Sequence, residues 1–247
     1  MNSVANWIHA PDSLLRLPEG TVHIWRASLD VPAASVVRLN TLLNSEESQR
    51  ADRFVQERDR HHFIVCRAVL RLLLGRYLER SSSTVHLLTQ QFGKTVLAID
   101  DLGIPLHFNL SHSHGLAIYA FCFGHELGVD LERLRPEIAT EEIANRFFSI
   151  RERQELASLP RSARVEGFFN AWTRKESYVK AHGKGLQIPL DSFDVTLAPG
   201  QPVILRSLDS DCWRIYSFTP AENFTAALTV GAGEWKLDFY EAESFLK

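Results

Sequence analysis

Helical segments and short strand segments are grouped apart in each half of the chain, and this order limits the fold more than any single motif. In the first half, the patterns predict strands at 21–30, 85–89, 96–99, 106–110 and 116–123 and helices at 32–43, 45–54 and 59–78. In the second half, they predict helices at 141–148, 150–159 and 164–181 and strands at 127–132, 193–197, 203–208, 213–218, 224–230 and 235–240. Such grouping indicates an α+β fold rather than a doubly wound parallel sheet.

The two halves are similar in length and in element order, although no sequence repeat accompanies the similarity. We therefore predict a pseudo-dimer of two similar α/β subdomains with antiparallel sheets. Gly124 marks a turn, which places the boundary between a subdomain at 1–124 and one at 125–247. A crevice between two such halves is a usual place for an active site.

Composition excludes several classes of protein. The chain has 247 residues with a net charge of −3, which gives no general reason to expect nucleic acid or membrane binding. The opening residues contain no signal-like apolar region, and no apolar run reaches about 18 residues. Cys66, Cys122 and Cys212 form no CxxC pair and lie in apolar or strand-like stretches, so we expect buried free thiols in a cytoplasmic protein. A duplicated chain favours a monomer.

The run Gly128–Glu132 carries two carboxylates with one residue between them. On a strand, Asp130 and Glu132 would project from the same face, with Val129 and Leu131 directed to a core. Adjacent carboxylates repel one another unless a cation or a proton lies between them, and hard oxygen ligands of this kind suit Mg²⁺. The alternative is a solvent-facing strand end.

The segment 164–181 predicts a long helix whose apolar stripe contains an acid. Val165, Phe169, Trp172, Glu176 and Val179 follow at spacings of four, three, four and three. A carboxylate in such a stripe is costly unless it is paired or metal-bound. One alternative is an ion pair within the helix between Glu176 and Lys180; the other is a site in which Lys175 and Lys180 hold phosphate oxygens near a metal.

Two further stretches carry polar residues that are compatible with phosphate binding. Ser111 and His112 follow a predicted strand; the alternatives are a serine-capped turn, or zinc binding by His112 and His114 without further ligands at a useful spacing. Arg53, Arg60, Arg67 and Arg71 would share one face of a continuous helix, which is also typical of a solvated face. Residues 55–59 could interrupt that helix.

Near residue 150, Ser149 and Glu152 fit a capping box, in which the glutamate reaches back to the start of its helix. A Ser-His hydrolase is disfavoured because the chain has no G-x-S-x-G motif, and no phosphate-binding glycine loop is present.

With these segments in order, the chain resembles the 4′-phosphopantetheinyl transferase superfamily, in its larger, single-chain, broad-range class. The resemblance covers about residues 50–197, and its motifs are Gly128–Glu132, Trp172–Lys180 and Gly183–Leu186, supported by Asn109–Ser113 and Phe147–Ser149. It implies a pseudo-dimeric α+β fold with the site between the halves.

The resemblance also implies a role for each matching residue. Asp130, Glu132 and Glu176 would bind Mg²⁺, with Mn²⁺ as an alternative ion. Lys180 would contact the transferred phosphate, and Glu176, or else Glu152, would take the proton of the attacking serine. The implied coenzyme A contacts are Lys94, Ser111, His112, Lys175, Lys180, Arg50, Arg53, Arg67 and Arg71.

The implied reaction transfers the 4′-phosphopantetheine arm of coenzyme A to a serine of an acyl or peptidyl carrier protein and releases adenosine 3′,5′-bisphosphate. Two alternatives stay open: a non-catalytic module that binds coenzyme A or a carrier protein, and a phosphotransferase that uses a nucleoside triphosphate. Fatty-acid, polyketide and peptide-synthesis carriers are all compatible with the sequence. An acidic carrier helix would find a dock in the basic residues Arg133, Arg135, Arg146 and Arg151.

Overall fold

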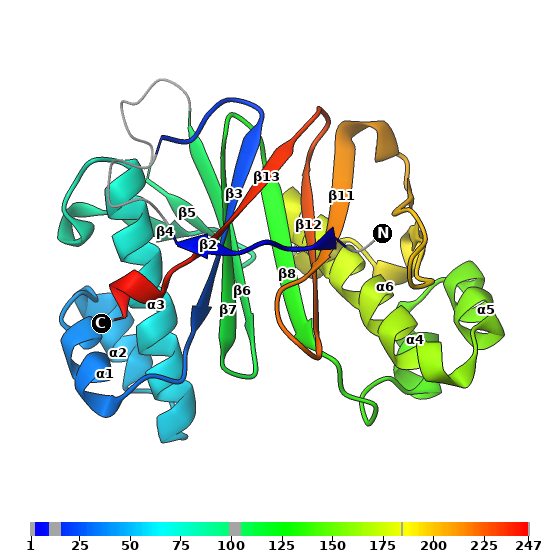
Figure 1. The fold of residues 1–247 in the computed structure, drawn as a ribbon, viewed down its shortest axis with the longest axis horizontal. Helices are drawn as coiled ribbons and strands as arrows, with labels where there is room; N and C mark the ends of the chain where they lie inside the picture. Colours follow the sequence, from blue (N-terminus) through cyan, green and yellow to red (C-terminus); the bar gives the residue numbers. More distant parts are fainter. Residues whose placement is uncertain (1–2, 10–15, 99–104, 184, 247) are drawn as a thin grey trace.

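Two stacked β-sheets form the centre of the protein. The computed structural model describes residues 3–9, 16–98, 105–183 and 185–246 (Figure 1). One sheet has the strand order β2 (Ile8–His9), β13 (Lys236–Glu241), β3 (Thr21–Ser28), β7 (Leu116–Phe123), β6 (Leu106–Ser113). The other has the order β1 (Ser3–Val4), β11 (Trp213–Thr219), β12 (Phe224–Gly231), β8 (Leu127–Arg133). Two small hairpins lie outside these sheets, β4 (Leu87–Thr89) with β5 (Thr95–Leu97), and β9 (Asp194–Val195) with β10 (Leu205–Arg206).

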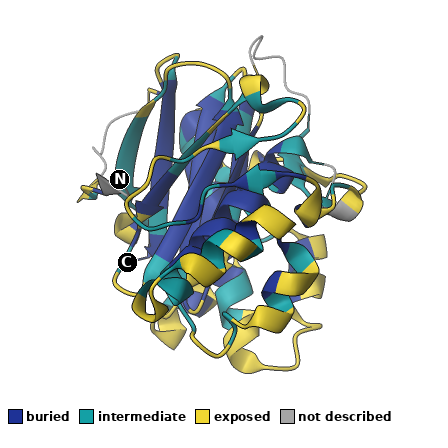
Figure 2. Ribbon diagram, turned by 90° about the vertical axis from the view of Figure 1, so that its right-hand side faces the viewer, coloured by how far each residue is buried: buried dark blue, intermediate teal, exposed yellow. Residues whose placement is uncertain are grey.

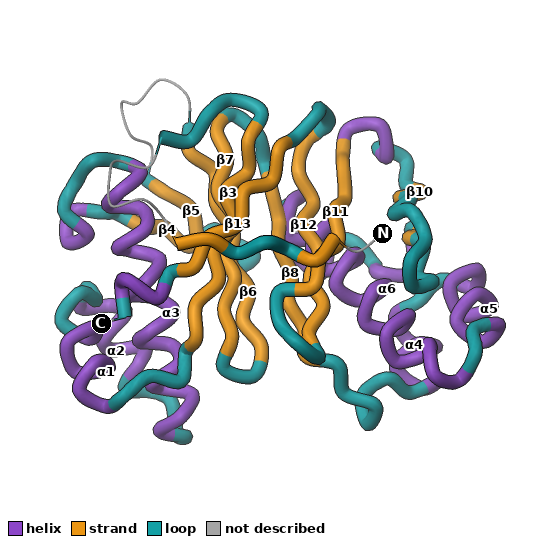
Figure 3. Tube along the Cα trace, viewed as in Figure 1, coloured by secondary structure: helices purple, strands orange, loops and turns teal. Residues whose placement is uncertain are grey.

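Helices cover the outer face of each sheet, so the order of layers is helix, sheet, sheet, helix (Figures 1 and 3). The five-stranded sheet is covered by α1 (Ala33–Asn40), α2 (Ser45–Ala51) and α3 (Glu57–Tyr77). The four-stranded sheet is covered by α6 (Arg161–His182), with α4 (Glu141–Phe147) and α5 (Ile150–Ser158) farther out. The α+β class and the two subdomains are as the sequence predicts.

Successive side chains on the central strands point to opposite faces of the sheet, so the position of a residue along its strand decides which neighbouring layer it faces. On β8, Leu127, Val129 and Leu131 belong to the apolar core between the two sheets. Gly128, Asp130 and Glu132 therefore face the other way, toward α6, as the sequence pattern predicts. Figure 2 shows the result, with buried strands in the centre and exposed helix surfaces outside.

The ends of the chain cross between the two sheets, which the order of elements did not predict. The first strand, β1, pairs in parallel with β11 of the four-stranded sheet. The last strand, β13, pairs in parallel with β3 of the five-stranded sheet. The central pairs are antiparallel as predicted, and each parallel pair within the described residues involves β1 or β13. The boundary at 124/125 stays a prediction.

Two smaller expectations have different outcomes. Cys66 and Cys122 are buried free thiols, but Cys212 is exposed, so the expectation of three buried thiols was wrong. It lies in the short 3₁₀ turn η4 (Ser210–Cys212), where the chain leaves the sheet before β11 begins. Among the described residues, no helix combines the length and the apolar character needed to cross a membrane.

The backbone of α6 lies directly on β8 at Gly128. A Cβ atom built on Gly128 would come within 2.2 Å of the Ser177 carbonyl oxygen and 2.3 Å of the Ala181 amide nitrogen. Both of these are backbone atoms, so no side-chain rotation can relieve the overlap. The absence of a side chain at this position therefore brings the helix that carries Glu176 onto the strand that carries Asp130.

We expect Gly128→Ala to reduce the free energy of unfolding by about 3 kcal/mol, because the added methyl group must push α6 away from the sheet. Urea unfolding followed by circular dichroism measures this loss. Gly200→Ala is a matched control: its Cβ would meet nothing within 4 Å, although the backbone there is left-handed (φ +75°), so it should cost only about 1 kcal/mol. Equal losses in the two variants would contradict the close approach at Gly128.

Candidate functional site

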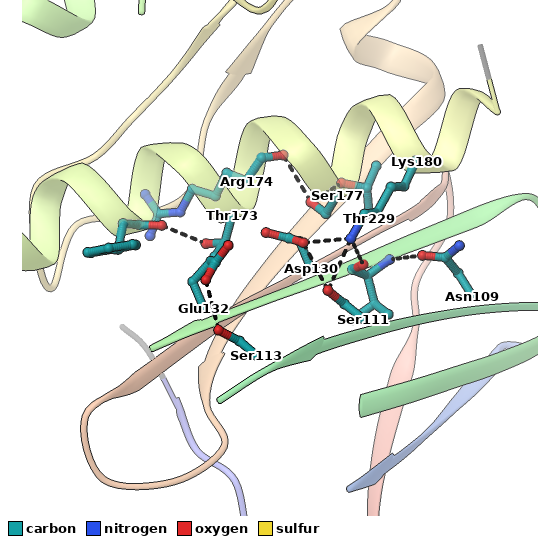
Figure 4. Close-up of polar contacts among 12 residues, drawn as sticks. Asn109, Ser111, Ser113, Asp130, Glu132, Thr173, Arg174, Ser177, Lys180 and Thr229 are labelled. Atoms are coloured by element: carbon teal, nitrogen blue, oxygen red, sulfur yellow. Dashed lines mark hydrogen bonds and ion pairs between the residues drawn. The ribbon is translucent and has the colours of Figure 1, made fainter. Parts of the chain in front are cut away.

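A row of polar side chains joins the edges of the two sheets. Strands β6 and β8 are the facing edge strands, and alternate residues of β6 reach across to β8 (Figure 4). Asn109 Oδ1 accepts from the Val129 backbone N–H (2.9 Å), Ser111 Oγ donates to Asp130 Oδ1 (3.0 Å) and Ser113 Oγ donates to Glu132 Oε2 (2.9 Å). We call Asn109, Ser111 and Ser113 the polar seam. Strand β6 runs to Ser113, so Ser111 and His112 lie within it rather than in a turn.

Helix α6 contributes the remaining side chains of the site. Gly183, in the left-handed conformation (φ 66°), ends the helix just after Lys180 and His182. The Ser177 and Thr229 hydroxyls hydrogen-bond at 2.8 Å, and Arg174 Nε donates to Ser217 Oγ (2.9 Å). These buried bonds fix the rotation of the helix over the sheet, so that Lys180 points toward β8.

Lys180 pairs with the strand rather than with its own helix. Its ammonium lies 2.6 Å from Asp130 Oδ1 and also donates to Ser111 Oγ (3.1 Å) and to the Val129 carbonyl (3.3 Å). The other carboxylate oxygen of Asp130, Oδ2, is buried and has no hydrogen-bond partner within the described part of the chain. A buried carboxylate oxygen without a partner is costly, and this one is available to a cation.

Glu132 and Glu176 complete a cluster of three acids with Asp130. Burial, followed by the negative charge of Asp130, raises the pKa of both Glu132 and Glu176. The nearby Glu132 charge raises the pKa of Glu176 further, while Lys180 lowers both pKa values. One ammonium therefore does not offset the mutual repulsion of the three carboxylates.

A pocket of about 380 Å³ opens beside this cluster, between the two halves. Glu176 and Lys180 reach it from α6, and Arg50, Arg67, Lys94 and His112 from the first half. Three phenylalanines, Phe63, Phe92 and Phe108, supply apolar walls. Partial desolvation and the nearby Lys180 ammonium lower the pKa of His112. The pocket thus combines cationic side chains with aromatic surface, as a phosphorylated, partly apolar ligand requires.

The predicted arginine stripe is not continuous, because α2 ends at Ala51 and α3 begins only at Glu57. Arg67 lines the pocket, and its buried Nη1 finds no hydrogen-bond partner among the described residues. Arg53 lies beside Arg50 in a separate surface hollow. Arg71 is buried and donates to Glu47 Oε2 at 2.6 Å, so its side chain holds α3 to α2.

Glu152 and Lys175 form an ion pair of their own inside the second half. Their charged atoms are 2.8 Å apart and both side chains are 0% exposed. Glu152 also accepts from the backbone N–H groups of Ser149 (2.9 Å) and Val195 (2.8 Å), which confirms the capping box. Lys175 donates to the carbonyls of Leu190 and Phe193, both at 2.6 Å. The structure does not bring either residue to the pocket, so an ammonium of Lys175 beside Glu176 is not observed.

Sequence reasoning missed several residues of this region. Ser113 could have been found, because it follows Ser111 at the two-residue period of a strand. Phe63 and Glu126 gave no local signal, since the partners that make them relevant lie far away in the sequence. Within the described ranges, no three His, Cys, Asp or Glu side chains already converge in a metal-binding arrangement. The ligand set Asp130, Glu132 and Glu176 therefore stays a prediction.

Comparison with known proteins identifies the family. The family model described as 4′-phosphopantetheinyl transferase superfamily matches residues 126–229, and the one described as 4′-phosphopantetheinyl transferase, N-terminal, matches residues 30–123. The chain therefore belongs to the 4′-phosphopantetheinyl transferase superfamily, in the class with an N-terminal and a C-terminal domain, and it is an enzyme that transfers phosphopantetheine from coenzyme A to carrier proteins.

Two 4′-phosphopantetheinyl transferases agree with this assignment. The 4′-phosphopantetheinyl transferase HetI of Nostoc sp. is 36% identical over 234 residues, which cover 95% of this chain and 97% of the relative. Sfp of Bacillus subtilis is 34% identical over 70% of this chain and 75% of its own. A holo-(acyl-carrier-protein) synthase from Bacillus anthracis, solved in complex with CoA, aligns with 43% of this chain and 94% of its own at 24% identity, with a TM-score of only 0.34.

We expect Lys175→Met to reduce the free energy of unfolding by about 3–5 kcal/mol, because it leaves the Glu152 carboxylate buried without a counter-charge. The double variant Glu152→Gln/Lys175→Met should recover part of this loss, since it leaves neither charge. Chemical denaturation monitored by fluorescence measures both. Lys236→Met serves as the control, since that lysine is 73% exposed in its pair with Asp238 and should contribute less than about 1 kcal/mol. A Lys175→Met variant as stable as the control would show that the pair does not support the fold.

Proposed function

We propose that the pocket between the halves binds coenzyme A and that the adjoining acids and Lys180 transfer its 4′-phosphopantetheine arm to a serine hydroxyl of an acyl or peptidyl carrier protein. The observation that carries this proposal is that Glu176 and Lys180 line a pocket with further cationic side chains, while Lys180 is ion-paired with Asp130 beside it. In the reaction, the serine oxygen forms a bond to the β-phosphorus while the pyrophosphate bond breaks, and adenosine 3′,5′-bisphosphate leaves.

We propose that Asp130, Glu132 and Glu176 bind Mg²⁺, with Mn²⁺ as an alternative ion, because hard carboxylate oxygens suit such a cation. The unpartnered Asp130 Oδ2 and the raised pKa values of Glu132 and Glu176 both describe negative charge that lacks a counter-ion. When bound, Mg²⁺ would neutralise charge on the pyrophosphate and on the leaving group. Among the described residues, Lys180 forms its ion pair with Asp130, which leaves the carboxylates of Glu132 and Glu176 to bind the metal.

The remaining residues act by binding and by moving one proton. Lys180, which lines the pocket, stabilises negative charge on the transferred phosphate. Glu176 also lines the pocket, and its raised pKa makes it a stronger base than an ordinary glutamate, so we assign the serine proton to it. Glu152, the second candidate base, lies in the core with both oxygens engaged. Arg67, with its unpartnered Nη1, and Arg50 supply positive charge for coenzyme phosphates, and Ser111 and His112 lie beside Lys180.

We expect Glu176→Gln and Asp130→Ala each to lower the rate of transfer by at least about 100-fold while the protein stays folded, because each removes charge at the reacting phosphate. Intact-mass spectrometry of a panel of apo carrier proteins, incubated with enzyme, coenzyme A and Mg²⁺, measures the gain of one phosphopantetheine arm. Glu234→Gln removes an exposed acid away from the pocket and should leave the rate unchanged. If wild-type protein binds coenzyme A but modifies none of the carriers, the non-catalytic module becomes the better description.

We expect Mg²⁺ to raise the melting temperature of the wild-type protein, since an ion that binds only the folded state stabilises it by mass action. The shift should be much smaller in Asp130→Asn and Glu176→Gln, which keep the shape of the side chain but remove its charge. Differential scanning fluorimetry with and without a chelator measures the shift, and an equal ionic strength of NaCl is the control for screening. The same shift in all three proteins would rule out this set of ligands.

A monomeric state and a cytoplasmic location stay predictions.

A further inference from the structure

One wall of the coenzyme pocket is a turn that the main sheets do not hold. The turn at residues 90–94 joins β4 to β5, and among the described residues these two strands pair with each other and with neither main sheet. An isolated two-stranded hairpin is marginally stable by itself. A second pocket, of about 640 Å³, lies on the other side of this hairpin and is lined by Gln90, Lys94 and Val96 among others. Within the described residues, the turn thus lies between two pockets, while the strands that carry it pack on the core through Leu87 and Leu97.

The turn lies against the two glycines that follow α6. A Cβ atom on Gly185 would come within 3.1 Å of Phe92 Cβ, and one on Gly183 within 3.4 Å of Lys94 Cδ. Phe92, Gly93, Lys94, Gly183 and Gly185 all line the coenzyme pocket. This wall is thus formed by the first half of the chain resting on the second.

Lys94 connects the turn to the second half. Its ammonium donates to Glu126 Oε2 (2.6 Å), to the Leu127 carbonyl (3.3 Å) and to the Ala181 carbonyl (3.3 Å). These three acceptors match the three N–H donors of an ammonium group, and the Lys94 side chain is only 9% exposed. A lysine whose three N–H groups are all engaged in this way has no donor left for a phosphate, although its side chain lines the pocket.

Glu126, directly before β8, is the charged partner in this contact. His107 Nδ1 on β6 lies 3.3 Å from the second oxygen of the carboxylate, Oε1. The hydrogen bonds from His107 and Lys94 lower the pKa of Glu126 to about 2, so it is ionised at neutral pH. The Glu126 carboxylate therefore carries a negative charge next to the Lys94 ammonium.

We propose that Glu126 is a positioning residue for the transferase reaction: it holds Lys94, and through Lys94 the 90–94 turn, in place as a wall of the coenzyme pocket. This inference rests on the proposed function of that pocket. It assigns Lys94 a mechanical role in place of the direct coenzyme A contact that the family resemblance implies. The role of Glu126 is to preserve the shape of the pocket, and it takes no part in the chemical step.

Two variants and their combination test the proposal, namely Glu126→Gln, Lys94→Met and the double variant. In the coenzyme-free protein, hydrogen exchange of the amides of Gln90 and Gly93, which are bonded to the carbonyls of Lys94 (2.8 Å) and Gln90 (2.9 Å), reports on opening of the turn. We expect exchange to become about tenfold faster in each single variant. The double variant should exchange no faster than either single variant, because all three lose the same charged hydrogen bond between Lys94 and Glu126. Glu234→Gln is the control.

The expected kinetic effect of these variants is confined to the KM for coenzyme A. The KM for coenzyme A should rise about tenfold in both single variants and equally in the double, while kcat and the KM for the carrier stay within about twofold. Overall stability should change little, since neither substitution touches Leu87 and Leu97, through which the hairpin packs against the core.

Two results would overturn the proposal. If Lys94 binds a phosphate directly, Lys94→Met will raise the KM for coenzyme A but Glu126→Gln will not, and exchange in the turn will be unchanged. Unchanged exchange in both single variants would refute it on structural grounds alone. Failure of the wild-type protein to bind coenzyme A would instead refute the proposed function, and the exchange measurement would still decide whether Glu126 and Lys94 hold the turn.

Discussion

The contact between Lys180, Asp130 and Ser111 holds the site together, because each residue comes from a different layer of the protein. Lys180 lies on α6, Asp130 on the edge of one sheet and Ser111 on the edge of the other. The polar seam also satisfies backbone groups of β8 that an edge strand would otherwise leave unpaired. The same hydrogen bonds that close the gap between the sheets therefore place the carboxylates of the proposed site.

The structure separates two kinds of ion pair that look alike in the sequence. Glu152 and Lys175 have no exposed surface, and both form further hydrogen bonds with backbone N–H and C=O groups. Asp130 and Lys180 pair just as closely, at 2.6 Å, yet Asp130 keeps an oxygen without a partner and Lys180 faces a pocket. The first arrangement is complete and serves the fold. The second is incomplete within the described protein, which is the property expected of a site that receives charged ligands.

The sequence predicted the parts of this structure that depend on local periodicity. The long helix, the Gly128–Glu132 strand with its two acids on one face, and the capping box at Ser149 are all as expected. The partner of each buried charge was not predictable, because Lys175 meets Glu152 and Lys94 meets Glu126 across 23 and 32 positions of the chain, respectively. Arg71 shows the same limit: its spacing suited a ligand-binding face, but its neighbour in space is Glu47. Local pattern determines which face a side chain occupies, and tertiary packing determines what it meets there.

The exchange of terminal strands makes the two halves interdependent in a way that an internal duplication alone would not. The strand nearest the start of the chain completes the sheet of the second half, and the strand nearest the end completes the sheet of the first. A polypeptide cut at the middle would leave each piece with an open sheet edge and without one of its own strands. The backbone thus links the two halves directly. The two walls of the cleft between them can separate only after the pairing of β1 with β11 or of β13 with β3 is broken.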